Sequence, residues 1–340
     1  MKFKTTAIAM AVAGTVAAPA AVQAGADEIY ASARVGIEYA ETAAKDDGGT
    51  TVDSQGDTQI RSVASRFGAR GETDLGNGLT GFGRYEWGVD FNNDDSDDLS
   101  GDGSFTTRHR YVGLKGDFGS ALVGQTYHTF YNFVVGGTDV PWVGSGFNQV
   151  AYVGRTDNGL TYAGSSDAFA FGVTLYMNRD QDEEAVDVYE VGGSFTFGND
   201  MTLGLAYQGT AGDLDDGDGT LIGNSNDEGV FGAMLTGVML GDSSWGFGTQ
   251  AQDDDYSFIV DAGFNNFYAH VEYEFLDKDS PGNSNEDGDD QEPVMTTIGY
   301  NQPLGRKTQM YYEAIYNDAD TGNSDDDGTW LYAVLKYDII

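Results

Sequence analysis

The sequence predicts an all-β fold: a transmembrane antiparallel up-and-down β-barrel of sixteen strands, with its third external loop folded into the lumen. Three observations predict it. Polar and apolar side chains alternate along most of the chain, as in strands with one wet face and one apolar face. Short turns alternate with long acidic loops, a pattern typical of barrels that span membranes. No apolar run after the N-terminal leader is long enough for a transmembrane helix, so only a closed sheet could cross a bilayer.

The N-terminus has the features of a secretory signal peptide over residues 1–24. Two lysines precede an apolar run of small residues, and Val22-Gln23-Ala24 forms a small-x-small cleavage site. The apolar run is shorter than the roughly 20 residues that a membrane-spanning helix needs. We therefore expect export, cleavage after Ala24 or Ala26, and a single barrel domain over residues 25–340.

The alternation places the strands and assigns their faces. In the first strand Ser32 and Arg34 share the polar face, while Val35 and Ile37 share the apolar face. The predicted strands are 28–41, 58–75, 78–91, 104–118, 119–126, 149–164, 167–180, 186–198, 200–211, 228–240, 244–252, 256–264, 267–277, 293–304, 308–319 and 328–339.

Odd and even residue numbers likewise assign side chains to the two faces of the second and fourth of these strands. Val63 is expected on the apolar face of the second strand, and His109 is expected to face away from the lumen in the fourth. The residues expected on the polar faces are Ser62, Arg66 and Arg70 in the second strand, and Arg108 with Arg110 in the fourth.

Composition excludes several classes of protein. There are 17 basic and 55 acidic residues, and the formal net charge of −38 argues against nucleic acid as a partner, because phosphate binding needs surplus Lys and Arg. With 20 Tyr, 19 Phe and 4 Trp, the chain is too aromatic for a disordered protein. Without cysteine it has no disulfides, thiol chemistry or Cys-ligated metal.

The acidic residues are concentrated in the predicted loops 42–57, 92–103, 212–227, 278–292 and 320–328. Carboxylates on alternate positions with glycine resemble calcium loops, although no loop has the full ligand pattern. A solvated acidic surface, as in a salty medium, is the favoured interpretation, and it would concentrate cations. No cofactor is expected. The candidate ligands for divalent cations are Asp213, Asp215, Asp318 and Asp320.

The segment 127–148 differs from the acidic loops. It contains six aromatic residues, including Trp142, and a single acid, Asp139. An exposed loop of this composition would form a large apolar patch. We therefore expect it to fold inside the barrel, where it would act as a constriction; another strand pair or a subunit interface is the alternative.

Several motifs resemble one family. They are RFGARGET at 66–73, LTGFGRYE at 79–86, RHRYVGLKGDFG at 108–119, VGR at 153–155 and GLTY at 159–162. In their order along the chain they resemble the general diffusion porins of the Gram-negative outer membrane. The resemblance implies a sixteen-stranded trimeric barrel whose third loop narrows a pore for small hydrophilic solutes and ions. It also implies contact with lipopolysaccharide or outer-membrane lipid, and insertion by the β-barrel assembly machinery.

The resemblance also implies a set of pore-lining residues. In such porins a basic ladder faces acids of the third loop across the constriction. The matching positions are Arg66, Arg108 and Arg155, with Arg34 nearby on the first strand and Glu86 as a lumen acid; parity adds Arg70 and Arg110. For any single arginine, a salt bridge to a neighbouring strand is an equally good explanation.

The chain departs from the family pattern in its third loop. The usual Pro-Glu-Phe-Gly-Gly is here Pro141-Trp142-Val143-Gly144-Ser145, so Trp142 replaces an acid and Asp139 is the only acid left. The negative side of the constriction is therefore weakened or moved. The chain also ends in isoleucine where porins usually end in phenylalanine.

Three other functions remain open from the sequence. A solute-selective pore could stack sugars on the aromatic loop or hold anions with arginines. A structural or adhesive barrel would not conduct. An enzymatic barrel is disfavoured, because neither a Gly-x-Ser-x-Gly nor a His-Glu-x-x-His motif is present. We expect a passive, cation-preferring pore.

Overall fold

A computed structural model describes residues 28–45, 51–90, 105–143, 154–155, 158–177, 186–198, 200–210, 229–278, 290–318 and 328–339. The predicted signal peptide and its cleavage site lie outside these ranges, as do most of the acidic loops. Within the described ranges, no helix has both the length and the apolar character required to cross a bilayer.

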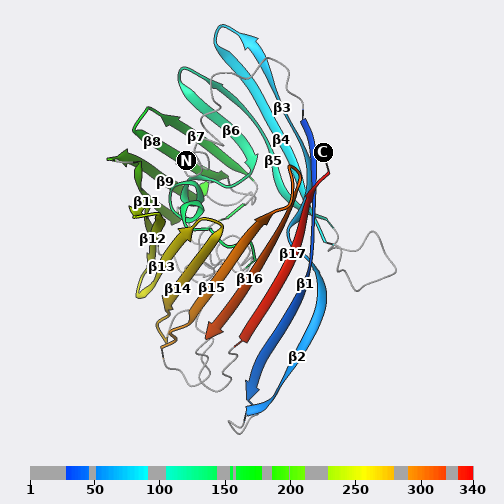
Figure 1. Ribbon diagram of the computed structural model, residues 1–340. Coiled ribbons are helices and arrows are strands. Elements are labelled where there is room, and N and C mark those ends of the chain that lie inside the picture. Colours follow the sequence, from blue (N-terminus) through cyan, green and yellow to red (C-terminus); the bar gives the residue numbers. More distant parts are fainter. Residues whose placement is uncertain are drawn as a thin grey trace.

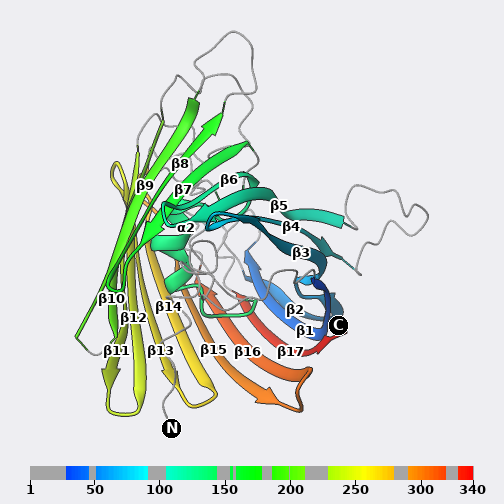
Figure 2. The same cartoon turned by 90° about the horizontal axis from the view of Figure 1, so that it is seen from above.

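The described strands form one closed antiparallel sheet in which consecutive strands pair, except β2 with β3, and β1 closes the ring by pairing with β17 (Figures 1 and 2). Because β2 and β3 both pair with β1 as one interrupted strand, the barrel has the predicted sixteen strands. Their bounds are β1 Glu28–Lys45, β2 Thr51–Ser62, β3 Ser65–Gly76, β4 Leu79–Val89, β5 Phe105–Gly116, β6 Gly119–Gln125, β7 Gly159–Ser165, β8 Phe169–Met177, β9 Val186–Phe197, β10 Met201–Thr210, β11 Val230–Leu240, β12 Ser243–Gln252, β13 Asp255–Phe264, β14 Phe267–Phe275, β15 Val294–Pro303, β16 Thr308–Asp318 and β17 Gly328–Asp338.

The two faces of the sheet differ as the alternation predicts. Val35 and Ile37 on β1 and Leu335 on β17 are exposed on the outside, where a membrane barrel meets lipid. Ser32 and Arg34, on the opposite face of β1, are buried. The apolar band therefore lies outside the barrel and the polar face lies inside.

The interruption between β2 and β3 overturns part of the face assignment. Ala64 has a φ of 53°, in the left-handed region, and it breaks the period-two pattern. Ser62 pairs with Val35 whereas Arg66 pairs with Ser32, so the predicted shared face of Ser62 and Arg66 is wrong. Val63 is buried in a cluster instead of lying on the apolar outer face.

Two predicted boundaries are also corrected. The loop predicted at 42–57 is largely strand, because β1 continues to Lys45 and β2 begins at Thr51. The strand predicted at 149–164 begins only at Gly159, after Asn158 with a φ of 59°, so Arg155 precedes the strand.

The segment after β6 packs against two parts of the barrel wall. It contains the short helix α2, Thr129–Phe133, and the 3-10 turn η1, Val135–Gly137. Figure 2 shows α2 beside the wall that contains β8–β10, with which its residues make contact. Phe130 and Phe133 pack there with Ala206 and Val230, while Trp142 and Val143 pack against a second cluster that contains Tyr311, Tyr332 and Val334.

Candidate functional site

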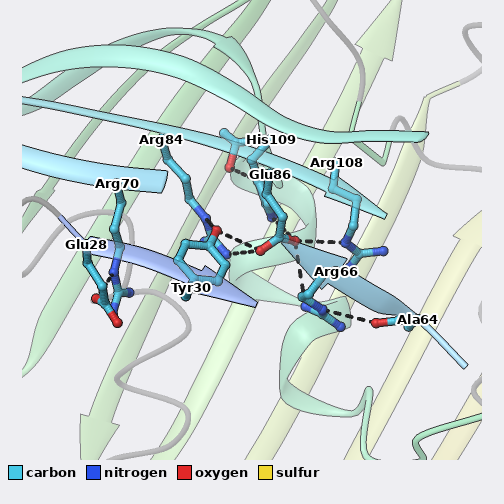
Figure 3. A network of polar contacts seen from close by, with 10 residues as sticks. Glu28, Tyr30, Ala64, Arg66, Arg70, Arg84, Glu86, Arg108 and His109 are labelled. Carbon is cyan, nitrogen blue, oxygen red and sulfur yellow. Dashed lines mark hydrogen bonds and ion pairs between the residues drawn. The ribbon is translucent and has the colours of Figure 1, made fainter. Parts of the chain in front are cut away.

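Glu86 on β4 is fully buried and is surrounded by basic side chains (Figure 3). Its Oε2 accepts hydrogen bonds from Tyr30 Oη at 2.9 Å and from Arg84 Nη2 at 2.5 Å. Its Oε1 accepts one from Arg108 Nε at 2.9 Å and lies 3.7 Å from Arg66 Nη1. The carboxylate therefore ties together β1, β3, β4 and β5. We call Glu86 and these three arginines the Glu86 cluster.

Three residues that form polar contacts on the inner face were not named as candidate site residues: Arg84, Tyr30 and Arg61. Arg84 has the same parity as Glu86 two residues further along β4, which was a usable signal for a shared face. Tyr30 follows from parity in the same way on β1. Arg61 on β2, which donates to Glu38 at 2.6 Å, was missed because the break after Ser62 shifts the parity.

A bulge in β5 changes the predicted faces of its charged residues. Glu86 pairs with His109 but Trp87 pairs with Thr107, so Arg108 is an extra residue in β5. As a result both Arg108 and His109 lie beside Glu86, with His109 Nε2 at 3.9 Å. His109 was expected to face away from the lumen, and that expectation is wrong.

Arg110 lies on the other face. It pairs with Tyr85, whose ring is exposed on the outside of the barrel, and Arg110 is itself exposed. The predicted common face of Arg108 and Arg110 is therefore wrong as well, because Arg108 is the bulged residue and Arg110 pairs with the outward-facing Tyr85.

Arg70 shares the polar face but does not join the Glu86 cluster. Its pairing with Arg84 across the two strands gives it the predicted side. Arg70 Nε donates to Glu28 Oε2 at 2.7 Å, at an exposed position away from Glu86 (Figure 3). It is thus one of the arginines explained by a salt bridge to a neighbouring strand.

Arg34 and Arg155 stack on aromatic side chains of the segment that follows β6. The guanidinium carbon of Arg34 lies 5.0 Å from the centroid of the Trp142 ring. That of Arg155 lies 4.7 Å from the centroid of the Tyr127 ring, which also stacks on Tyr131 with the ring centroids 3.6 Å apart. Both distances suit a cation–π interaction. Arg34 and Arg155 therefore contact aromatic rings of this segment, where the family pattern predicts acids.

The far end of this segment is held by a carboxylate of β16. Glu313 accepts hydrogen bonds from the backbone N–H of Trp142 at 2.5 Å and of Val143 at 2.9 Å, and from the Tyr268 hydroxyl. The Trp142 ring also stacks on Tyr311 at 4.9 Å. The Trp142 ring thus contacts both Tyr311 and Arg34, and its backbone N–H is bonded to Glu313.

The near end of the segment is held in the same way. Glu190 on β9 accepts a hydrogen bond from the Phe130 backbone N–H at 2.8 Å and one from the Tyr176 hydroxyl at 3.0 Å. Asp139, between the two ends, is exposed and accepts a hydrogen bond from Tyr131 Oη at 2.8 Å. Each end therefore combines a buried carboxylate, a backbone N–H and a tyrosine of the wall.

We expect replacement of Trp142 by alanine to loosen the far end of this segment. The change removes one aromatic pair, with Tyr311, and two cation–π contacts, with Arg34 and Lys336, together worth about 2–3 kcal/mol. Limited proteolysis of the folded protein should show faster cleavage within 127–148, with a lower thermal unfolding midpoint. Trp142→Phe keeps a stacking ring and is the matched control. Equal cleavage rates in wild type and Trp142→Ala would contradict this role.

Of the four candidate cation ligands, Asp318 alone lies in the described part of the chain. That part contains no cluster of three or more His, Asp or Glu residues suited to a metal ion. Asp318 ends β16, whereas Asp213, Asp215 and Asp320 lie outside the described residues. The histidine Nδ1 atoms of His109, His128 and His270 contact Thr126, Thr161 and Asp261 respectively.

Comparison with known proteins gives a consistent result. A family model described as Gram-negative porin matches residues 5–339. Outer membrane protein F of Serratia marcescens is 30% identical over 160 residues, which cover 42% of this chain and 41% of that protein. Outer membrane porin C of Rahnella aquatilis is 32% identical over 118 residues, covering 34% and 29%. The matched stretches thus span less than half of these relatives.

Solved structures show the same fold. OmpF of Salmonella typhi in complex with daunomycin aligns with a TM-score of 0.67 at 18% identity, covering 92% of this chain and 97% of that one. The anion-selective porin from Comamonas acidovorans aligns with a TM-score of 0.65 at 15% identity, covering 93% and 100%. At these identities the likeness concerns the barrel architecture alone.

Proposed function

The chain belongs to the Gram-negative porin family, and on that premise we propose that it forms a water-filled channel across the outer membrane. Small hydrophilic solutes and ions would diffuse through it passively, without cofactor or catalysis. The observation that carries the proposal is the Glu86 cluster. A partly solvated network of charges on the polar face of a closed sheet suits a water-filled lumen better than a packed core.

The segment 127–148 is proposed as the constriction. Its described part is held by Glu190 near one end and by Glu313 at the other, and both carboxylates lie on the polar face of the sheet. A loop attached at two separate parts of the inner wall would reduce the cross-section of the lumen that is available to solutes. In this proposal Arg34, Arg66, Arg108 and Arg155 line one side of the opening.

A planar bilayer tests the channel directly. Purified mature protein should give stepwise conductance, and closure in groups of three steps would support the homotrimer that the family resemblance implies. A structural neighbour from Vibrio cholerae, OmpT, is described in a trimer form. A barrel shown to be folded by circular dichroism but without conductance would overturn the channel and favour a structural or adhesive role.

The acidic composition supports a preference for cations. With a formal charge of −38 and acids concentrated in the connections between strands, the mouth of the pore would attract cations and repel anions. Under a potassium chloride gradient, we expect a reversal potential that favours potassium several-fold, with the preference falling as salt screens the charge. A reversal potential that favours chloride would reject the preference.

The remaining partners follow from the same premise. Export by a signal peptide over residues 1–24, insertion by the β-barrel assembly machinery and contact with lipopolysaccharide are what an outer-membrane porin requires. The exposed apolar face formed by Ile37, Val112, Leu331 and similar residues supports contact with lipid. Mass spectrometry of the mature N-terminus would distinguish cleavage after Ala24 from cleavage after Ala26.

A further inference from the structure

We propose that Trp142 and Tyr127 are positioning residues that keep the segment 127–148 in one geometry at high salt, because they hold it to Arg34 and Arg155 through aromatic contacts in place of ion pairs. The inference rests on the proposed function, since it concerns the segment that is proposed to narrow the lumen. The attachment of this segment can be measured in a barrel that does not conduct, so the two proposals are tested separately.

The acidic composition is typical of a protein that works in a salty medium. The formal charge is −38, and acids are concentrated in several long connections between strands. At an ionic strength of about 1 M the Debye length is about 3 Å, so an exposed ion pair loses much of its attraction. A loop attached to the wall by exposed ion pairs would therefore loosen as the salt concentration rises.

The described part of the segment is attached to the wall by contacts that salt screens weakly. Its single acid, Asp139, accepts a hydrogen bond from Tyr131 Oη, and no Lys or Arg of the described ranges forms an ion pair with it. Carboxylates of β9 and β16 accept hydrogen bonds from its backbone N–H groups. Because these carboxylates, Glu190 and Glu313, are only 0% and 3% exposed, their hydrogen bonds are shielded from ions in bulk solution.

Aromatic rings lie beside the basic side chains of the inner wall. The guanidinium carbon of Arg34 and Nζ of Lys336 lie 5.0 and 5.7 Å from the centroid of the Trp142 ring, and the guanidinium carbon of Arg155 lies 4.7 Å from that of Tyr127. A ring attracts a cation only at short range, and dispersion between the packed atoms adds to this attraction. Dispersion is not screened by salt, so these contacts persist where an exposed ion pair would weaken.

Both rings are held by further aromatic contacts. Trp142 stacks on Tyr311 with the ring centroids 4.9 Å apart, and Tyr127 stacks on Tyr131 with the centroids 3.6 Å apart. Tyr311 is fully buried, so the wall fixes the plane of the Trp142 ring. The family pattern has an acid at the position of Trp142, and here an aromatic contact replaces a contact that salt would screen.

Trp142→Glu tests the proposal, because it places a carboxylate beside Arg34 and Lys336 in place of the ring. The measurement is hydrogen exchange at the backbone N–H groups of residues 142 and 143 in the folded protein in detergent, relative to the unfolded chain. Between about 0.1 M and about 3 M potassium chloride, we expect protection to change less than about twofold in wild type. In Trp142→Glu it should fall about fivefold, as expected when one exposed ion pair is screened.

Two variants separate this role from a merely structural one, which would lower the protection of Trp142→Glu equally at every salt concentration. Trp142→Phe keeps an aromatic contact, so its protection should again be independent of salt. Val140→Glu adds the same charge where the side chain is 38% exposed, and its protection should also be independent of salt. If Trp142→Glu does not fold, Tyr127→Glu gives the same test at the Phe130 N–H group.

Hydrogen exchange and conductance together distinguish this proposal from the channel. Wild-type protection that fell with salt as steeply as that of Trp142→Glu would overturn the aromatic attachment, as would a Trp142→Glu variant whose protection did not depend on salt. The expected exchange in a barrel without conductance would support the attachment and overturn the channel. In a conducting barrel, the exclusion limit for polyethylene glycols should stay constant with salt in wild type and increase in Trp142→Glu, and a wild-type limit that increased with salt would overturn the proposal.

Discussion

Replacement of Glu86 by glutamine is expected to lower the free energy of unfolding by about 3–5 kcal/mol, the usual cost of breaking a buried ion pair by removing one partner. Glu86 is fully buried, and it is the only carboxylate in ion-pair contact with Arg66, Arg84 and Arg108 among the described residues. Glutamine keeps the size and one acceptor oxygen but removes the charge. Three guanidinium groups would then repel each other without compensation.

Thermal and denaturant unfolding in detergent micelles would measure this loss. Glu28→Gln is the matched control, since Glu28 also pairs with an arginine, Arg70, but its side chain is 48% exposed. An exposed pair contributes only about 0–1 kcal/mol. The bilayer provides a second measurement, because Glu86→Gln removes a negative charge from the lumen and should shift the reversal potential toward chloride. Wild-type stability and selectivity in Glu86→Gln would refute the central role of this carboxylate.

The fold was predictable because both environments of a membrane barrel constrain its sequence: lipid requires apolar side chains on the outer face, and the water-filled lumen requires polar ones on the inner face. Lipid requires Val35 and Ile37 outside, and the lumen requires Ser32 and Arg34 inside, so each strand carries its own orientation in its sequence. The family match confirms the resemblance drawn from the motifs around Arg66 and Arg108, and the closed antiparallel sheet confirms the fold class.

The assignment of side chains to the inner or outer face by odd and even residue number fails where a strand departs from regular pairing. A one-residue irregularity moves every later side chain to the opposite face. The left-handed Ala64 does this between β2 and β3, and the extra residue Arg108 does it in β5. Nothing local in the sequence marks either position, so Val63, in the interruption between β2 and β3, and His109 and Arg110 in β5 were assigned to the wrong faces.

The site was only partly predictable for a different reason. Motif positions identified Arg66, Glu86 and Arg108, which the structure brings together. The family pattern places acids of the third loop opposite the arginines, but here Trp142 and Tyr127 occupy that role as stacking partners. Which ring meets which arginine depends on the path of the segment that follows β6, and strand periodicity carries no information about that path.

Replacement of Phe133 by alanine is expected to release the α2 segment and enlarge the pore. Phe133 is fully buried in the cluster with Phe130 and Val134, and removing a buried phenylalanine costs about 3–5 kcal/mol. Its ring lies in a notch made by glycines of the wall. A Cβ on Gly172 or Gly192 would lie within 3.0 Å of the Phe133 ring.

The Phe133 ring therefore packs closely against the wall at Gly172 and Gly192. Because the missing side chains at the two glycines leave room for this ring, alanine at position 133 would leave a cavity that nearby groups cannot fill. The segment should then dock less firmly although the barrel remains closed. Conductance in the presence of polyethylene glycols of increasing size should show a larger exclusion limit for Phe133→Ala than for wild type.

The matched control for this experiment is Val140→Ala. Val140 is in the same segment but 38% exposed, so its truncation should leave the exclusion limit and the thermal midpoint almost unchanged. If Phe133→Ala kept the wild-type exclusion limit while its barrel stayed folded, packing of α2 would not determine the size of the opening. The limit would then have to depend on the carboxylate clamps, and Glu190→Gln and Glu313→Gln would be the variants to compare, because each weakens one attachment of the loop without opening a cavity.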